Sequence, residues 1–191
     1  MIYLASLSPR RAELLAQINI NYQKVAVNVD ETPHPHEIPQ DYVIRLALAK
    51  ARAGRLALST AQPVLGADTT IVCNKQILGK PLDENDAKQM LRQLSGGSHK
   101  VMTAVALVTT TQEKVRLNIN KVYFRQLTEA DIQAYVATGE PMDKAGSYAI
   151  QGLASVFIER IIGSYSGVMG LPLYETAKLL DEIGVKIFLK A

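Results

Sequence analysis

The sequence predicts an α/β fold built on a mixed β-sheet. Strand-like and helix-like segments alternate along the 191 residues, as they do in α/β proteins. Two long strand-like segments, 101–109 and 114–125, follow one another, which favours a mixed sheet over a purely parallel one. A length of 191 residues fits one domain or two lobes that share one sheet, and we expect a single domain spanning residues 1–191.

Turn and cap residues divide the first part of the chain. Ser8 is a favourable N-cap residue and Pro9 suits the first position of a helix. Three prolines between residues 30 and 39 predict a loop before a long helix. An Asn74-Lys75 turn joins two strands as a hairpin. The expected elements are the strands 2–5, 22–29, 64–73 and 76–78 and the helices 9–18 and 40–58.

The second part of the chain is divided in the same way. Asp83–Asp86 resembles a capping box, and Thr128 is a suitable cap for the next helix. Residues 139–152 have no periodic pattern and are expected to be irregular. The remaining expected elements are the helices 83–94, 128–137 and 172–183 and the strands 101–109, 114–125, 155–162 and 185–189.

Charge and composition exclude several classes of protein. The net charge of +3 comes without any block of like charges, so we expect no nucleic-acid partner. No apolar run reaches the roughly 18 residues of a membrane span, and the N-terminus does not resemble a signal peptide. The one cysteine, Cys73, rules out an internal disulfide and a cysteine-based zinc site. A cytoplasmic location is therefore expected.

The start of the chain has the outline of an anion site. Ser6 and Ser8 lie in a turn between the first strand and a helix whose first turn contains Arg10 and Arg11. Unpaired N–H groups and the helix dipole make a helix N-terminus favourable for anions, whereas two arginines there oppose the dipole. A bound phosphate would compensate that repulsion. The alternative is that both arginines point into water.

Lys50 and Asp68 are charged residues at positions where apolar ones are expected. Lys50 falls on the same face of its predicted helix as Val43, Leu46 and Ala47. It either extends its ammonium to the surface or serves an anion in a cleft. Asp68 interrupts an apolar strand, where burial is costly without a cation or hydrogen-bond donors. Asp68 is thus a candidate metal ligand or general base, the alternative being an aspartate that holds a turn.

Further polar candidates lie in loops. Glu31 follows the second predicted strand, and Lys80 lies in a turn before a helix. Gln151, in a segment bounded by glycines, offers a donor and an acceptor that suit the edge of a nucleobase. Each residue alone also fits a solvated loop or an ordinary connector. Taken together, several cations with two carboxylates suit a metal-bound polyphosphate.

These residues belong to motifs whose order and spacing resemble the Maf family of nucleoside triphosphate pyrophosphatases. Each motif alone is weak, but together they cover nearly the whole chain. The motifs are Ser6-Leu-Ser-Pro-Arg-Arg11, Val29-Asp-Glu31, Arg45-Leu-Ala-Leu-Ala-Lys50, Gly66-Ala-Asp-Thr69, Gly79-Lys-Pro81, Leu94-Ser-Gly96, Asp143-Lys-Ala-Gly146, Tyr148-Ala-Ile-Gln-Gly152 and Gly170-Leu-Pro172.

The resemblance implies a fold and a reaction. The expected fold is an elongated, mixed sheet flanked by helices, with two lobes and a deep cleft, similar to inosine triphosphatases, and commonly a homodimer. The expected reaction splits a nucleoside triphosphate between its α- and β-phosphates with Mg²⁺ or Mn²⁺. By position, Asp68 would accept the proton or bind the metal with Glu31. Lys50 and Lys80 would act on the phosphates in catalysis, and Ser8 and Arg11 would bind the triphosphate.

Three further positions indicate the substrate. The branch of the family that acts on dTTP and UTP has Arg, Thr and Gln where this chain has Arg10, Thr69 and Gln151. A sister branch directed at 7-methyl-GTP tends to have Trp, Gln and Glu instead. The sequence therefore resembles the dTTP/UTP branch. The alternatives are the 7-methyl-GTP branch and a nucleotide-binding regulator of cell division whose turnover is incidental.

Overall fold

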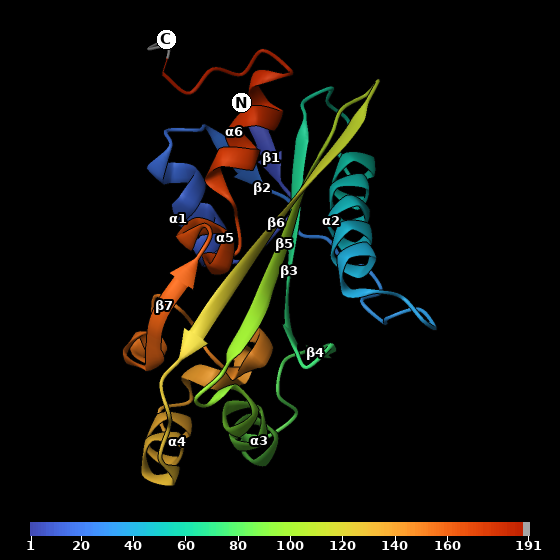
Figure 1. Ribbon diagram of the computed structural model, residues 1–191. Coiled ribbons are helices and arrows are strands. Elements are labelled where there is room, and N and C mark those ends of the chain that lie inside the picture. Colours follow the sequence, from blue (N-terminus) through green and yellow to red (C-terminus); the bar gives the residue numbers. More distant parts are fainter. Residues whose placement is uncertain (189–191) are drawn as a thin grey trace. The chain divides into compact units, whose positions relative to one another are not determined.

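The structure is a computed structural model that describes residues 1–188. The fold is built on a seven-stranded sheet that is flanked by helices (Figure 1). The strands are β1 (Ile2–Leu4), β2 (Tyr22–Lys24), β3 (Val64–Cys73), β4 (Gln76–Leu78), β5 (Ser98–Val108), β6 (Glu113–Phe124) and β7 (Ile158–Ile162). The α-helices are α1 (Pro9–Gln17), α2 (Pro39–Leu56), α3 (Glu84–Leu94), α4 (Glu129–Val136), α5 (Tyr165–Met169) and α6 (Leu173–Asp181). Short 3₁₀ helices are η1 (Glu140–Asp143), η2 (Ala145–Ser147) and η3 (Leu153–Phe157).

The sheet is mixed, as predicted. Its strand order is β2-β1-β3-β5-β6-β7, and β4 pairs with β3. Strand β1 is parallel to β2 and to β3, whereas β4 and β7 are antiparallel to their neighbours β3 and β6. Asn74 and Lys75 both have positive φ values, 49° and 68°, as the two-residue turn of the predicted hairpin requires. Both the α/β class and the mixed sheet are confirmed.

The chain divides into two compact units. Unit 1 comprises residues 1–68, 103–118 and the chain from Gly170 onward, and unit 2 comprises residues 69–102 and 119–169. Strands β3, β5 and β6 contribute residues to both units. The expected organisation as one domain over residues 1–191 stays a prediction, for which an unfolding experiment is given below.

Unit 1 packs α2 closely against β3. A Cβ atom on Gly66 of β3 would lie 2.5 Å from the Ala47 carbonyl oxygen and 2.6 Å from the Ala51 nitrogen, both in α2. Only glycine allows the helix to approach the strand so closely. The largest fully buried side chains of this unit are Ile2, Leu4, Leu15, Leu46, Leu65, Leu107, Leu171, Leu179 and Leu180. Lys50 lies on α2 and Asp68 on β3, so this close packing joins the two elements that carry them.

Unit 2 has its own apolar core and its own helix caps. Its core gathers side chains of β3–β6, of α3 and α4, and of the irregular segment after α4. Asp83 accepts a hydrogen bond from the Asp86 N–H at the start of α3, and Thr128 forms a capping box with Asp131 at the start of α4. These contacts confirm both predicted helix starts. Helices α3 and α4 lie side by side (Figure 1).

Several predicted bounds differ from the structure. Strand β2 stops at Lys24 rather than at residue 29, because β1, the strand with which it pairs within residues 1–188, ends at Leu4. Residues 155–157 belong to η3, so the strand predicted from residue 155 starts at Ile158. Helix α5, a short helix between β7 and α6, was not expected. No helix within residues 1–188 is long and apolar enough to cross a membrane.

The predicted last strand is wrong over residues 185–188, which form no strand, and Leu189 lies outside the described residues. The end of α6 explains the difference. Gly184 has a φ of 79°, and the Val185 N–H donates to the Leu180 carbonyl oxygen at 2.9 Å. Such a glycine termination satisfies the last carbonyls of the helix and directs the following residues back along it.

Candidate active site

The connection between β1 and α1 brings together the serines and one arginine of the predicted anion site. The Arg11 guanidinium donates through Nη1 to Ser6 Oγ at 3.2 Å and through Nε to the Gly170 carbonyl oxygen at 2.8 Å. Ser6 Oγ also accepts the Ser8 N–H at 3.2 Å. Ser8 is the N-cap residue of α1, as predicted, but its hydroxyl makes no capping bond. The first turn of α1 contains no acidic residue, so its positive end is not neutralised within the helix.

Lys50 lies on the inward stripe of α2. Val43, Leu46 and Ala47 are buried, and the Lys50 side chain on the same face is only 13% exposed. Its Nζ contacts Asp68 Oδ1 and Glu31 Oε1, each at 2.6 Å. The ammonium is therefore held by two carboxylates and does not extend to the surface. The first of the two alternatives that the sequence left open is thereby excluded, and the role of Lys50 toward a bound anion stays a prediction.

Asp68 lies within β3, where its side chain is 9% exposed, and does not hold a turn. Burial raises the pKa of its carboxyl group above the ordinary value. The positive charges of Lys50 and Arg11 and the hydrogen bond from Lys50 act in the opposite direction, whereas the negative charge of Glu31 adds to the increase. A carboxylate with opposing influences of this kind is typical of a group that binds or exchanges a cation or a proton.

Glu31 is held beside Lys50 by two side chains of α2, Tyr42 and Arg45, to which the sequence analysis gave no role. The Tyr42 hydroxyl donates to the Glu31 carbonyl oxygen at 2.9 Å. Arg45 donates to the Thr32 carbonyl oxygen and forms a two-pronged pair with Glu37, at 2.6 and 2.7 Å. Burial raises the pKa of Tyr42 to about 12, so its hydroxyl remains a donor. The Glu31 loop is thus fastened to the helix that carries Lys50.

The two arginines of α1 differ in their surroundings. Surrounding protein atoms lower the pKa of the Arg11 guanidinium, and the carboxylates of Asp68 and Glu31 oppose that effect. The Arg10 charge lowers it further, so the two arginines repel one another. Arg11 thus belongs to the same electrostatic cluster as Lys50, whereas Arg10 acts on that cluster through its charge. Neither arginine simply points into water, because both are half-buried.

The other three predicted site residues belong to unit 2. Thr69 directly follows Asp68 in β3 and is half-buried. Lys80 follows β4 and is exposed. Gln151 is exposed in a turn between η2 and η3. Their predicted roles toward a substrate stay predictions.

The donor set of unit 1 fits a hard divalent cation. Asp68 and Glu31 both offer carboxylate oxygens and already share one positive group. Within residues 1–188, no cluster of three or more histidine, cysteine, aspartate or glutamate side chains could hold a metal ion. Mg²⁺ characteristically uses one or two carboxylates and takes its other ligands from substrate phosphates and water. The two carboxylates therefore suit a metal that arrives with a phosphorylated substrate.

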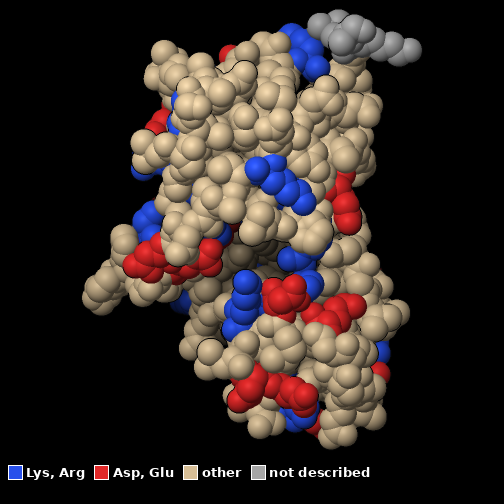
Figure 2. Space-filling view, turned by 180° about the vertical axis from the view of Figure 1, so that it is seen from behind, with Lys and Arg blue, Asp and Glu red and all other residues tan. Residues whose placement is uncertain are grey.

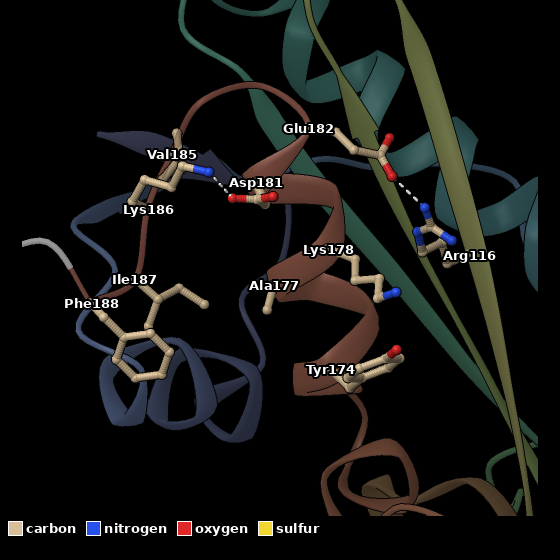
Figure 3. Close-up of a pocket in the computed structure, with 10 residues that line it drawn as sticks. All are labelled: Arg116, Tyr174, Ala177, Lys178, Asp181, Glu182, Val185, Lys186, Ile187 and Phe188. Atoms are coloured by element: carbon tan, nitrogen blue, oxygen red, sulfur yellow. Dashed lines mark hydrogen bonds and ion pairs between the residues drawn. The ribbon is translucent and has the colours of Figure 1, made fainter.

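A separate cavity of about 520 Å³ lies between α6 and the segment that follows it (Figure 3). It is lined by apolar side chains such as Ile187 and Phe188 and by charged groups that are already paired, Asp181 with Lys186 and Glu182 with Arg116. None of the predicted site residues lines it. This cavity is thus distinct from the Lys50–Asp68 cluster.

Charged side chains are mixed on the face shown in Figure 2. Among the residues described there, lysines and arginines alternate with aspartates and glutamates in small groups. This distribution agrees with the interspersed charges of the sequence.

Sequence comparison establishes the family. The family described as Maf-like protein matches residues 1–183. The chain belongs to the Maf-like family. This Maf-like protein is 55% identical to the dTTP/UTP pyrophosphatase of Shewanella sp. (strain MR-7), with 97% of this chain and 99% of the relative covered. It is 53% identical to the enzyme of the same name from Aromatoleum aromaticum, covering 96% and 95% of the two chains.

A third relative, the dTTP/UTP pyrophosphatase of Escherichia coli O157:H7, is 51% identical and covers 94% of this chain and 91% of its own. Among solved structures, the Staphylococcus aureus Ham1 protein is similar with a TM-score of 0.49 at 12% identity, covering 95% and 96% of the two chains. That structural likeness is too weak to carry an argument. The family assignment therefore comes from sequence, and the chemistry comes from the side chains described above.

Proposed function

We propose that this Maf-like protein hydrolyses dTTP and UTP to the nucleoside monophosphate and pyrophosphate. The observation that carries the proposal is the buried Asp68 carboxylate, which shares the Lys50 ammonium with Glu31 and lies in the field of Arg11. A buried carboxylate among cations suits the activation of water next to a polyphosphate. The name shared by the relatives supports dTTP and UTP as the substrates.

In the proposed reaction, a water molecule attacks the α-phosphorus. Asp68 accepts the proton of that water or fixes its orientation, a new phosphorus–oxygen bond forms, and the bond to the oxygen bridging the α- and β-phosphates breaks. Pyrophosphate leaves with the electron pair of that bond. Lys50 and Lys80 stabilise the charge of the leaving group, and Ser8 and Arg11 hold the triphosphate.

Asp68 and Glu31 are the proposed ligands of Mg²⁺ or Mn²⁺, and the bound ion would neutralise phosphate charge during the reaction. Lys50 already shows that both carboxylates accept one shared cation. Tyr42 and Arg45 keep Glu31 in reach by holding its loop on α2. We expect a Glu31→Gln variant to bind Mn²⁺ more weakly, and unchanged Mn²⁺ binding by this variant would count against the assignment.

Arg10, Thr69 and Gln151 are the proposed determinants of pyrimidine selectivity. An amide such as that of Gln151 can donate to O4 and accept from N3–H of uracil or thymine. Sites that hydrogen-bond a polar group discriminate strongly against analogues that leave a buried group unpaired.

We further propose that the protein works as a cytoplasmic homodimer without a nucleic-acid or membrane partner. Light scattering behind size exclusion measures the mass of the particle directly.

The experiment that tests the activity is pyrophosphate release from dTTP, UTP, CTP, GTP and 7-methyl-GTP with Mg²⁺ or Mn²⁺. We expect turnover of dTTP and UTP, and a loss of at least about 100-fold in the Asp68→Asn variant. Asp181→Asn is the matched control, because Asp181 is an exposed acid paired with Lys186 elsewhere in unit 1. Preference for 7-methyl-GTP would contradict the substrate, and no turnover of any triphosphate would contradict the activity.

A further inference from the structure

Gln151 lies at the tip of a hydrogen-bonded turn. The Gly152 N–H donates to the Ala149 carbonyl oxygen at 3.1 Å, which closes a four-residue turn over residues 149–152. Gln151 is exposed, whereas Ala149 and Ile150 before it are buried. The position of the Gln151 amide therefore depends on what holds the two sides of this turn.

On the N-terminal side, the turn is held by a buried hydrogen bond. The Tyr148 hydroxyl lies 2.7 Å from His99 Nε2, and both residues are at most 4% exposed. The Tyr148 ring also packs edge-on against Phe124, with ring centroids 4.9 Å apart. The last residue before the turn is thereby fixed to β5 through His99 and to β6 through Phe124.

On the C-terminal side, the turn is held by the carboxylate of Glu140. Glu140 Oε2 accepts the Leu153 N–H at 2.9 Å, and Oε1 accepts the Tyr135 hydroxyl at 2.8 Å. A Cβ atom on Gly152 would lie 2.3 Å from Glu140 Oε1, so only glycine admits the carboxylate at this place. Burial, followed by the hydrogen bond to Glu140, raises the pKa of Tyr135, which keeps its hydroxyl protonated as a donor.

We infer that Glu140 and Tyr148 are positioning residues that hold the Gln151 turn from its two sides and thereby set the selectivity for uracil and thymine over cytosine. The inference rests on the proposed function, since it concerns how that function selects its base. Neither residue needs to touch the substrate. Both act through the backbone of residues 149–153.

The effect follows from the geometry of hydrogen bonding. A bond between the Gln151 amide and a base edge weakens steeply when its angle or distance departs from the optimum. A displacement of about 1 Å at a recognition group costs up to about 100-fold in rate. Loosening the turn therefore reduces the rate for UTP. Cytosine presents the reverse pattern, an N4–H donor and an N3 acceptor, so an amide held in the orientation that suits uracil does not pair with it, and CTP loses less. Selectivity falls although the catalytic groups of unit 1 are unchanged.

The test compares kcat/KM for UTP and CTP in single-residue variants. We expect Glu140→Ala and Tyr148→Phe each to lower the UTP/CTP ratio by about 10-fold, mainly through a higher KM for UTP. Glu140→Gln retains an oxygen that can accept the Leu153 N–H, and we expect it to restore the ratio to within about 3-fold of the unaltered protein. Gln151→Ala is the reference for complete loss of the contact.

Two matched controls separate positioning from stability. Glu129→Ala removes an exposed carboxylate of unit 2 that pairs with Arg92, and Tyr123→Phe removes the hydroxyl of a half-buried tyrosine of β6 that interacts with Lys121. We expect both controls to keep the ratio. A ratio that is unchanged in Glu140→Ala and Tyr148→Phe but falls in Gln151→Ala would overturn the inference and leave the proposed function intact. No pyrophosphate release by the unaltered protein would overturn both, and Glu140→Gln and Tyr148→Phe keep the test open should Glu140→Ala not fold.

Discussion

His99 makes the stability of the fold depend on pH. Its side chain is buried in unit 2, and burial lowers its pKa to about 4, from an ordinary value of 6.5. Nε2 is bonded to the Tyr148 hydroxyl, and Nδ1 has no hydrogen-bond partner among the described residues. Protonation would therefore place a charge and an unmatched N–H donor inside the core.

The sign of the effect follows from which state takes up the proton first. As the pH falls below 6.5, His99 becomes protonated in the unfolded chain, while it stays neutral in the folded protein down to about pH 4. The contribution of neutral His99 to the free energy of unfolding is thus fully present above pH 6.5 and is lost as the pH falls toward 4. Between pH 7 and pH 4.5 the loss from this residue alone is about 2.5 kcal/mol.

The assay is urea unfolding followed by far-ultraviolet circular dichroism, because the chain contains no tryptophan. The free energy of unfolding of the unaltered protein is compared with that of His99→Gln at pH 7 and pH 4.5. Between pH 7 and pH 4.5, we expect the free energy of unfolding to fall by about 2.5 kcal/mol less in the variant than in the unaltered protein. His36→Gln, which alters an exposed histidine in the loop before α2, is the control. An identical loss in the unaltered protein and in His99→Gln would refute the argument.

Three further predictions concern the site and the fold. In Lys50→Met, Asp68 and Glu31 lose their shared cation, so we expect loss of pyrophosphate release and a stability loss of about 3 kcal/mol at pH 7. Urea unfolding at pH 7 measures this loss, and an unchanged free energy of unfolding in the variant would contradict the shared pairing. In Gly66→Ala, the new methyl group would collide with the α2 backbone. We expect the free energy of unfolding to fall by about 1–3 kcal/mol and the activity to be reduced. An unchanged free energy of unfolding would show that α2 can move away from β3. Because three strands run through both units, we expect one unfolding transition by calorimetry with equal calorimetric and van't Hoff enthalpies; two resolved transitions would contradict a single domain.

Much of the fold could be predicted because its signals are local. Asp83 and Thr128 cap helices where the sequence places them, and the Asn74-Lys75 turn forms the expected hairpin. The length of β2 could not be predicted, because it depends on where its neighbour β1 ends. The predicted last strand failed because its β-rich composition says nothing about whether a neighbouring strand is available for pairing.

The same distinction between local signals and contacts of distant residues applies to the candidate site. Lys50 and Asp68 were recognisable because each places a charge in an otherwise apolar pattern, and their contact confirms that they belong together. Tyr42 and Arg45 gave no such signal, since a tyrosine and an arginine on a partly exposed helix are ordinary. The partner of His99 was equally hidden, because Tyr148 is 49 residues away in the sequence. Contacts of this length become visible only when the chain is folded.

The bond between Arg11 and Gly170 has a consequence for synthesis on the ribosome. The two residues are 159 positions apart, so the acceptor for Arg11 Nε is synthesised long after Arg11 itself. Unit 2 ends at Met169, and all of its residues are made before the last segment of unit 1. A nascent chain can therefore complete the core of unit 2 while Arg11, in the first turn of α1, still lacks its hydrogen-bond acceptor on Gly170. The centre that begins at Ser6 is therefore complete only after Gly170 has been synthesised.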